Sequence, residues 1–122
     1  MLQGIHHVQL AAPPGCEREA RRFFGELLGL EELPKPEELA HRGGAWFRVG
    51  EQELPVGVEA HFQPARKAHP AFVVDDVRGL RGRLEAAGVP TTNPPGEGGA
   101  ERFFVEDPWG NRIELTELPA RG

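Results

Sequence analysis

The stretch RFFVEDPWGNRIEL, residues 102–115, decides how this sequence folds. Two runs that alternate apolar and polar residues flank the triplet PWG at 108–110. This pattern predicts two antiparallel strands joined by a turn, because period-two alternation is typical of a half-buried strand and proline and glycine favour turns. On the second strand Ile113 and Leu115 share one face, so Glu114 between them projects from the other. The chain is therefore predicted to close with a hairpin that carries a carboxylate on its polar side.

The order of elements that ends in this hairpin occurs twice, which indicates an internal duplication. Each half is predicted to contain a strand, a helix and three more strands. The first strand of each half carries a histidine, at His7 and His69. Near the end of each half, the triplet LPV, centred on Pro55, aligns with the triplet IEL, centred on Glu114. Pro55 and Glu114 are separated along the chain by nearly as many residues as His7 and His69. His7 and His69 are thus predicted to be equivalent, as are Pro55 and Glu114.

Hydrophobic periodicity, with glycine and proline as breakers, predicts the elements of each half. The first half is expected to have a helix from about Glu17 to Leu28, a loop at 37–44, and strands at 5–12, 30–33, 45–50 and 52–60. The second half is expected to have a helix capped by Asp75 or Asp76 and ending near Ala87, a loop at 94–100, and strands at 69–76, 89–93, from 101 and at 111–118. We expect one domain spanning 1–122, made of module 1 (about 4–60), a linker (61–67) and module 2 (about 68–118).

Composition limits the classes of function. The 122 residues are 39% hydrophobic, enough for one core, and the formal net charge of −5 with no basic run argues against nucleic-acid binding. Cys16 is the only cysteine, so an internal disulfide is excluded and a reducing compartment is favoured. No apolar stretch approaches the roughly 20 residues of a membrane helix, and the N-terminus lacks a signal-peptide core. A cytoplasmic protein without membrane or nucleic-acid partners is expected.

Strand alternation brings three chemically active residues to equivalent faces. The apolar face of each strand is expected to contact the helices, and His7, His69 and Glu114 all fall on the opposite face. Two imidazoles and one carboxylate from three strands have the composition of a site for a divalent metal, either Fe, Mn, Ni, Zn or Co. Three protein ligands leave coordination positions open for water and substrate.

Six segments of the chain resemble one known family: IHHVQL, FFGELLGLEEL, GGAWFRVGEQEL, AHPAFVVDDV, LEAAGV and RFFVEDPWGNRIELTE. This family is the vicinal oxygen chelate superfamily, which includes glyoxalases, bleomycin-resistance proteins and dioxygenases. The resemblance implies an α+β fold in which two βαβββ modules form a curved, mostly antiparallel eight-stranded sheet around a metal-bearing groove, with helices on its outer face. It also implies that the metal ligands are His7, His69 and Glu114, with the fourth ligand position at Pro55.

Pro55 departs from the family pattern, because proline has no side-chain donor atom. Glyoxalase I enzymes resemble this pattern but place a carboxylate there that is thought to act as the base, so glyoxalase I activity is disfavoured. Thiol transferases that modify fosfomycin and extradiol dioxygenases resemble the remaining set of two histidines and one glutamate. Glu53 and Glu59, on the same face as Pro55, are the candidates for a catalytic base.

The resemblance and the strand alternation together leave several functions open. We expect a metal-dependent enzyme of the lyase, thiol-transferase or dioxygenase type, whose small substrate chelates the metal through neighbouring oxygens. The alternatives are a non-catalytic drug-binding module of the bleomycin-resistance type and a degenerate member of the family. A homodimer is expected from the resemblance. The candidate substrate-binding residues, which share the face of the metal ligands, are Gln9, Trp46, Arg102, Phe104 and Arg112.

Overall fold

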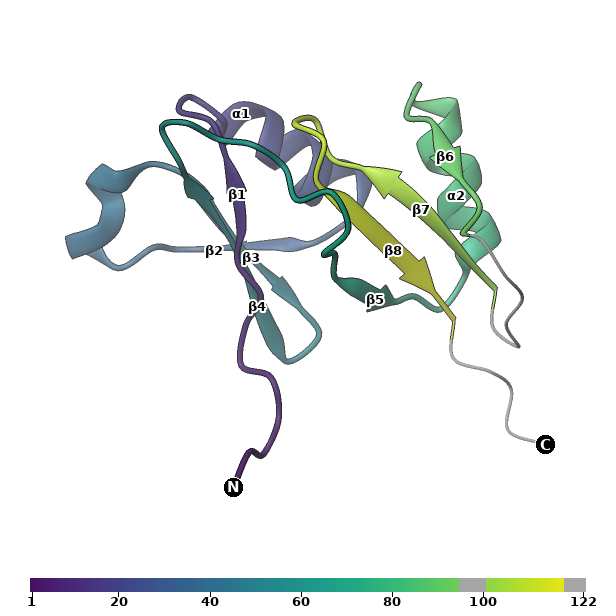
Figure 1. The fold of residues 1–122 in the computed structure, drawn as a ribbon, viewed down its shortest axis with the longest axis horizontal. Coiled ribbons are helices and arrows are strands. Elements are labelled where there is room, and N and C mark those ends of the chain that lie inside the picture. Colours follow the sequence, from purple (N-terminus) through teal and green to yellow (C-terminus); the bar gives the residue numbers. More distant parts are fainter. Residues whose placement is uncertain (95–100, 118–122) are drawn as a thin grey trace. The chain divides into compact units, whose positions relative to one another are not determined.

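The computed structural model describes residues 1–94 and 101–117 (Figure 1). Most of the predicted loop at 94–100 and the end of the last predicted strand, at Leu118, lie outside the described residues. The chain divides into two compact units, Met1–Pro64 and Ala65–Gly122. No helix in the described part of the chain is long and apolar enough to cross a membrane.

The first unit contains one four-stranded sheet and a helical segment. Its sheet has the order β1-β4-β3-β2, in which β1 runs parallel to β4 and the other neighbours are antiparallel. The helical segment starts as an α-helix and continues as a π-helix, where the Leu28 N–H donates to the Phe23 carbonyl five residues earlier. The elements in chain order are β1 (Leu10–Ala12), α1 (Glu17–Ala20), η1 (Arg21–Leu27), β2 (Glu31–Leu33), η2 (Glu37–Arg42), β3 (Ala45–Val49) and β4 (Gln52–Val58).

The second unit repeats this plan with a sheet of order β5-β8-β7-β6. Its register matches that of the first unit: Leu10 lies opposite Val56, and their repeat equivalents Phe72 and Leu115 lie opposite each other in the same parallel arrangement. The predicted α+β fold with two βαβββ modules is confirmed, and hydrogen bonds group its eight strands into two sheets of four. The elements are β5 (Ala71–Val73), α2 (Val77–Ala86), β6 (Thr91–Thr92), β7 (Arg102–Glu106) and β8 (Arg112–Thr116).

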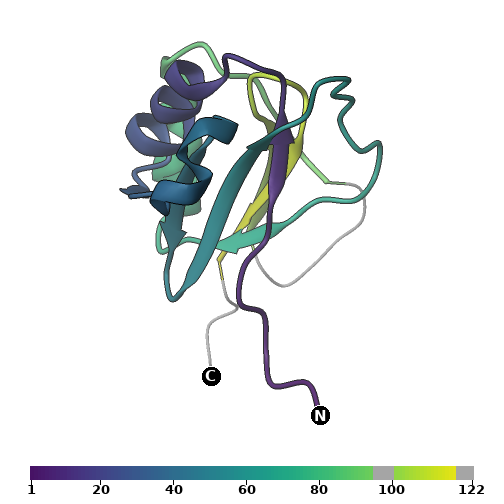
Figure 2. The same ribbon diagram turned by 90° about the vertical axis from the view of Figure 1, so that its left-hand side faces the viewer.

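Each sheet buries its apolar face against the helix of its own unit. In the first unit the ring of Phe24, on η1, lies 5.6 Å from that of Phe47 on β3, and Figure 2 shows the helical turns on one side of the strands. In the second unit Leu84 of α2 and Phe103 of β7 are likewise fully buried. Burial of such side chains stabilises the fold by roughly 1.5–3 kcal/mol each. The opposite face of each sheet, which we call the polar face, carries His7, Gln9, Trp46, Glu53 and Pro55 in the first unit, and His69, Arg102, Phe104, Arg112 and Glu114 in the second.

The first strand is shorter than the sequence predicts, and Pro55 explains why. The pattern at 5–12 predicts a continuous strand, but β1 covers only Leu10–Ala12, preceded by an isolated bridge between His7 and Glu53. Glu53 exchanges hydrogen bonds with the residues on either side of His7, at 3.1 and 3.3 Å. In this register the next residue of β4 whose backbone N–H would point at the first strand is Pro55, and proline has no N–H to donate. The ladder is therefore interrupted between the bridge and β1.

The segment at 37–44 is also more ordered than the predicted loop. Residues 37–42 form the 3-10 helix η2, and the following glycines are held by side chains from elsewhere. The Lys35 ammonium donates to the Gly43 carbonyl, and the Glu17 carboxylate accepts from the Gly44 N–H at 2.6 Å. The sequence pattern missed this segment because its order depends on contacts distant along the chain, not on periodicity.

Gly44 provides a test of this anchoring. Its φ is +84°, and a Cβ atom there would overlap the Val56 carbonyl oxygen. Gly44→Ala is therefore expected to lower the free energy of unfolding by roughly 2 kcal/mol or more. Gly82, inside α2, has open space around its Cβ position, so Gly82→Ala is expected to raise that free energy by roughly 0.5–1 kcal/mol. Urea denaturation of both variants checks the prediction, and equal effects would contradict it.

The contact of Glu17 predicts a pH-dependent contribution to stability. The hydrogen bond from Gly44 lowers the pKa of the Glu17 carboxyl below its ordinary value of 4.5. A lowered pKa in the folded state stabilises the protein above the unfolded value and loses its effect as the pH falls through the folded one. Glu17→Gln is expected to cost about 1 kcal/mol at neutral pH and progressively less as the pH falls below about 4.5. Denaturation at several pH values, with Glu19→Gln as an exposed control on the same helix, measures the difference; a cost independent of pH would contradict it.

Candidate metal-binding site

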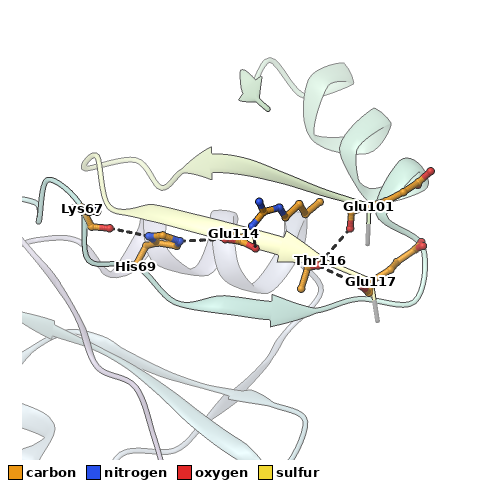
Figure 3. Close-up of polar contacts among 7 residues, drawn as sticks. Lys67, His69, Glu101, Glu114, Thr116 and Glu117 are labelled. Atoms are coloured by element: carbon orange, nitrogen blue, oxygen red, sulfur yellow. Dashed lines mark hydrogen bonds and ion pairs between the residues drawn. The ribbon is translucent and has the colours of Figure 1, made fainter. Parts of the chain in front are cut away.

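His69 and Glu114 lie in contact on the polar face of the second sheet. Strand β8 carries Glu114 opposite Ala71 of β5, and His69 precedes Ala71 by two residues on the same face. The His69 Nε2 atom lies 3.2 Å from the Glu114 Oε1 atom (Figure 3). The Glu114 side chain is 12% exposed and that of His69 24% exposed, so Glu114 is largely removed from water and the His69 ring only partly. The structure thus brings together two of the three residues predicted as metal ligands.

The backbone carbonyl of Lys67 orients the His69 ring. It lies 2.8 Å from Nδ1 and accepts a hydrogen bond, so Nδ1 carries a proton. In the neutral ring Nε2 then has a free lone pair directed at Glu114 (Figure 3). Metal-binding histidines typically donate their second ring N–H to such a carbonyl, which fixes the tautomer. The hydrogen bond therefore prepares Nε2 to accept either a proton or a cation.

The separation of Nε2 and Oε1 fits a shared metal ion. Two ligand atoms bound at about 2.0–2.2 Å, with angles between about 90 and 110° at the metal, lie about 2.8–3.6 Å apart. The observed separation of 3.2 Å falls within this range. Imidazole nitrogen and carboxylate oxygen are also the donors that Fe(II), Mn(II), Ni(II), Zn(II) and Co(II) accept. The 3.2 Å separation of the two atoms is thus that of two ligands of one ion, and equally that of a direct hydrogen bond.

Other predicted site residues surround this pair. Arg102 on β7 contacts the second oxygen of Glu114, with Nη1 3.4 Å from Oε2. Phe104 lies directly opposite Glu114, and the edge of its ring meets the His69 ring at a centroid distance of 5.2 Å. The Arg112 guanidinium lies over the same Phe104 ring, 4.9 Å from its centroid. Arg102, Phe104 and Arg112 therefore share the surroundings of His69 and Glu114.

A buried turn fixes the hairpin that carries Glu114. The Asp107 Oδ1 accepts from the N–H groups of Trp109 and Asn111, and Oδ2 accepts from the Asn111 side-chain amide at 2.7 Å. Burial raises the pKa of the Asp107 carboxyl above its ordinary value. The role of these two side chains was missed from the sequence, although aspartate and asparagine bracketing Pro-Trp-Gly are a recognisable signal for such a turn. Their hydrogen bonds hold β7 and β8 in the register that places Glu114 opposite Phe104.

The first unit contributes His7 to the polar face of its own sheet. The His7 ring is exposed, and its Nδ1 lies 3.0 Å from Nδ1 of His6. Glu53 lies opposite His7, so this candidate base is beside the histidine without any shift in register. The second candidate base, Glu59, follows the end of β4 and is exposed.

The equivalent of Glu114 in the first unit is a buried proline. The register that pairs His7 with Glu53 and Leu10 with Val56 places Gln9 opposite Pro55. Trp46 lies opposite Pro55 from the other side, on β3. Gln9 and Trp46, two predicted substrate-binding residues, therefore flank the position that lacks a donor atom. Within either unit, the described residues include no cluster of three or more histidine, cysteine, aspartate or glutamate side chains placed to bind a metal.

Comparison with known proteins identifies the family. The sequence model of the Glyoxalase/Bleomycin resistance protein/Dioxygenase superfamily matches residues 4–115. The chain belongs to this superfamily. No protein in a curated collection matches the chain.

Solved structures of this superfamily share the fold. A glyoxalase family protein from Bacillus anthracis is 51% identical, with a TM-score of 0.92 and 96% of each chain covered. Lactoylglutathione lyase from Agrobacterium tumefaciens is 23% identical, with a TM-score of 0.72 and coverage of 95% of this chain and 94% of the other. The fosfomycin resistance protein FosX from Listeria monocytogenes is 18% identical, with a TM-score of 0.77 and coverage of 97% and 95%. At these two lower identities the likeness is one of fold, so activity has to be argued from the residues of the site.

Proposed function

We propose that this chain is a divalent-metal-dependent enzyme of the glyoxalase superfamily, with His7, His69 and Glu114 as the metal ligands. The observation that carries the proposal is the His69–Glu114 pair, whose ligand atoms are 3.2 Å apart while Lys67 holds the other ring nitrogen. His7 is included because it is the repeat equivalent of His69 and lies on the equivalent face of its sheet. A bound divalent ion would act there as a Lewis acid towards a substrate that chelates it through two neighbouring oxygens.

The remaining residues of the polar faces would bind and orient the substrate. Gln9 supplies an amide that both donates and accepts hydrogen bonds, whereas Trp46 and Phe104 supply apolar surface. Arg102 holds the second oxygen of Glu114 and so directs the first towards His69. Glu53, opposite His7, is better placed than Glu59 to accept a proton from a bound substrate.

The absence of a side-chain donor at position 55 narrows the type of reaction. Pro55 is buried and has no side-chain donor, so the base that a glyoxalase I would use is absent from that position. We therefore favour a thiol-transferase or dioxygenase type, or a lyase that takes its base from elsewhere, over glyoxalase I itself. We also propose that residues 1–122 form one domain and that the protein is a cytoplasmic homodimer, as suggested by its family; light scattering after size exclusion tests the dimer.

One observation favours a second candidate, a non-catalytic module that binds small molecules. Both oxygens of Glu114 already have partners in the structure, because Oε1 faces His69 and Oε2 faces Arg102. If His69 is protonated, this network is complete without a metal ion. A drug-binding module of the bleomycin-resistance type would keep the network in that form.

Elemental analysis of the purified protein separates the two candidates. The enzyme is expected to contain one equivalent of Fe, Mn, Ni, Zn or Co per chain, or to take up one equivalent of Co(II) after treatment with a chelator. A metal-free protein that takes up no Co(II) and binds an aromatic or cationic drug would support the binding module and overturn the proposal.

A further inference from the structure

We propose that Arg112 binds an oxyanion of the substrate, so that the substrate is a small acid with a carboxylate or phosphonate group and a second oxygen on a neighbouring carbon. This inference rests on the proposed function, since it names the class of substrate for that same site. It assigns the acid group to Arg112 and the neighbouring oxygen to the metal ion that His69 and Glu114 would hold. Three features of Arg112 carry it: its unused donors, its fixed position and the aromatic ring that it shares with His69.

The Arg112 guanidinium is not paired with a carboxylate among the described residues. Glu106 lies directly opposite Arg112 in the β7–β8 hairpin, where cross-strand charges usually meet. No ion pair joins these two described residues; the guanidinium lies instead over the Phe104 ring, 4.9 Å from its centroid. Arg102, the other arginine of this polar face, does contact a carboxylate, that of Glu114. Arg112 is therefore the arginine here whose N–H groups remain available to a ligand.

Phe104 fixes the position of Arg112 next to the ligand pair. A guanidinium over an aromatic face is held by the ring quadrupole, which orients the planar donors without consuming them. The same ring contacts His69 at 5.2 Å, and Phe104 itself lies opposite Glu114. Arg112 and His69 thus contact the same ring, so an acid group bound to Arg112 would lie on the same face of the sheet as the His69–Glu114 pair.

The chemistry of the guanidinium selects the oxyanion. Its N–H groups form a planar fork that matches the two oxygens of a carboxylate or phosphonate. Arg112 is also half-buried, and charge-assisted hydrogen bonds are stronger where water is partly excluded. The equivalent position in the first unit is Glu53, which has the opposite charge. Recognition of the anion is thus a property of the second unit, which gives the substrate one orientation.

Calorimetric titration of the full chain, in its metal-free and Zn(II)-loaded forms, tests the inference. The probes are glycolate and hydroxymethylphosphonate, with ethylene glycol as a neutral probe that keeps two neighbouring oxygens. Arg112→Gln is expected to weaken binding of at least one of the anions by roughly tenfold or more, and Arg112→Lys is expected to restore only part of it. Which anion binds more tightly to the unmodified protein identifies the acid group. The control is Arg22→Gln, which removes an exposed arginine of η1 that contacts Glu26 at 3.8 Å and should leave anion binding unchanged.

The outcomes separate this inference from the proposed function. Co(II) affinity is measured on every variant, and Arg112→Gln is expected to retain it. If the unmodified chain binds no metal, the proposed function fails, while a loss of anion binding in the metal-free Arg112→Gln variant still supports Arg112. If the metal binds but Arg112→Gln binds both anions as tightly as the unmodified protein, this inference alone is overturned. Binding of neither anion by the unmodified chain also overturns it. Thermal melts show whether each variant is folded. If Arg112→Gln does not fold, the weakening of anion binding is measured on Arg112→Lys instead.

Discussion

The His69→Ala variant is expected to lose high-affinity binding of Co(II), with a dissociation constant at least roughly 100-fold above that of the unmodified protein. His69 supplies the nitrogen that faces Glu114 at 3.2 Å, and its other ring nitrogen is already occupied by the Lys67 carbonyl. Alanine removes the ligand and leaves Glu114 without its histidine partner. Titration of the chelator-treated protein, followed by the visible absorption of Co(II), measures the change.

The matched control is His61→Ala. His61 is exposed and is expected to contribute nothing to the site, so its variant should bind Co(II) like the unmodified protein. Equal affinities of the His69→Ala and unmodified proteins would refute the assignment of His69 as a ligand. Equal losses in both histidine variants would show that Co(II) binds non-specifically at the surface.

Pro55→Glu is expected to tighten Co(II) binding by roughly tenfold or more. Position 55 is the repeat equivalent of Glu114, as the shared register of the two sheets shows. A carboxylate there would supply the missing fourth ligand, and its charge would be compensated by the metal. The substitution also restores an N–H group to β4 at the point where the ladder with β1 is interrupted.

Pro55→Gln is the control for this variant, because it has the same size and restores the same N–H group without the charge. The difference between the two variants therefore isolates the contribution of the carboxylate. Co(II) affinity that is the same in Pro55→Glu and Pro55→Gln, with both proteins folded by thermal melts, would show that position 55 does not face the metal. A gain of glyoxalase activity in Pro55→Glu would support the assigned position further.

Much of the second unit could be predicted from the sequence. Alternation along β8 places Glu114 on the face opposite to that of Ile113 and Leu115. The repeat makes His69, on the neighbouring strand entry, the equivalent of His7. The contact of His69 with Glu114 therefore follows from strand geometry. The carbonyl of Lys67 could not be predicted, because backbone groups at a strand entry leave no trace in residue type. The availability of Arg112 was also hidden, because alternation places both arginines on one face and only side-chain packing distinguishes them.

The first unit shows where sequence patterns fail. The pattern at 5–12 is that of a strand, but the missing N–H of Pro55, far along the chain on β4, interrupts it. The segment at 37–44 has no periodicity, yet Glu17 and Lys35 anchor its end. In both cases the local structure depends on a hydrogen bond that is made or lost between residues far apart along the chain. A local sequence pattern carries no information about such a bond.

We propose His7 and His69 as ligands of one metal ion, and NMR of the Co(II)-loaded protein tests this proposal most directly. Coordinated imidazoles give strongly shifted, exchangeable ring N–H signals, so the account predicts two such signals for one equivalent of Co(II). His7→Ala should remove one of them and His69→Ala the other. A Co(II)-loaded protein whose shifted signals are unchanged by His7→Ala, or a chain that takes up no Co(II), would contradict the account.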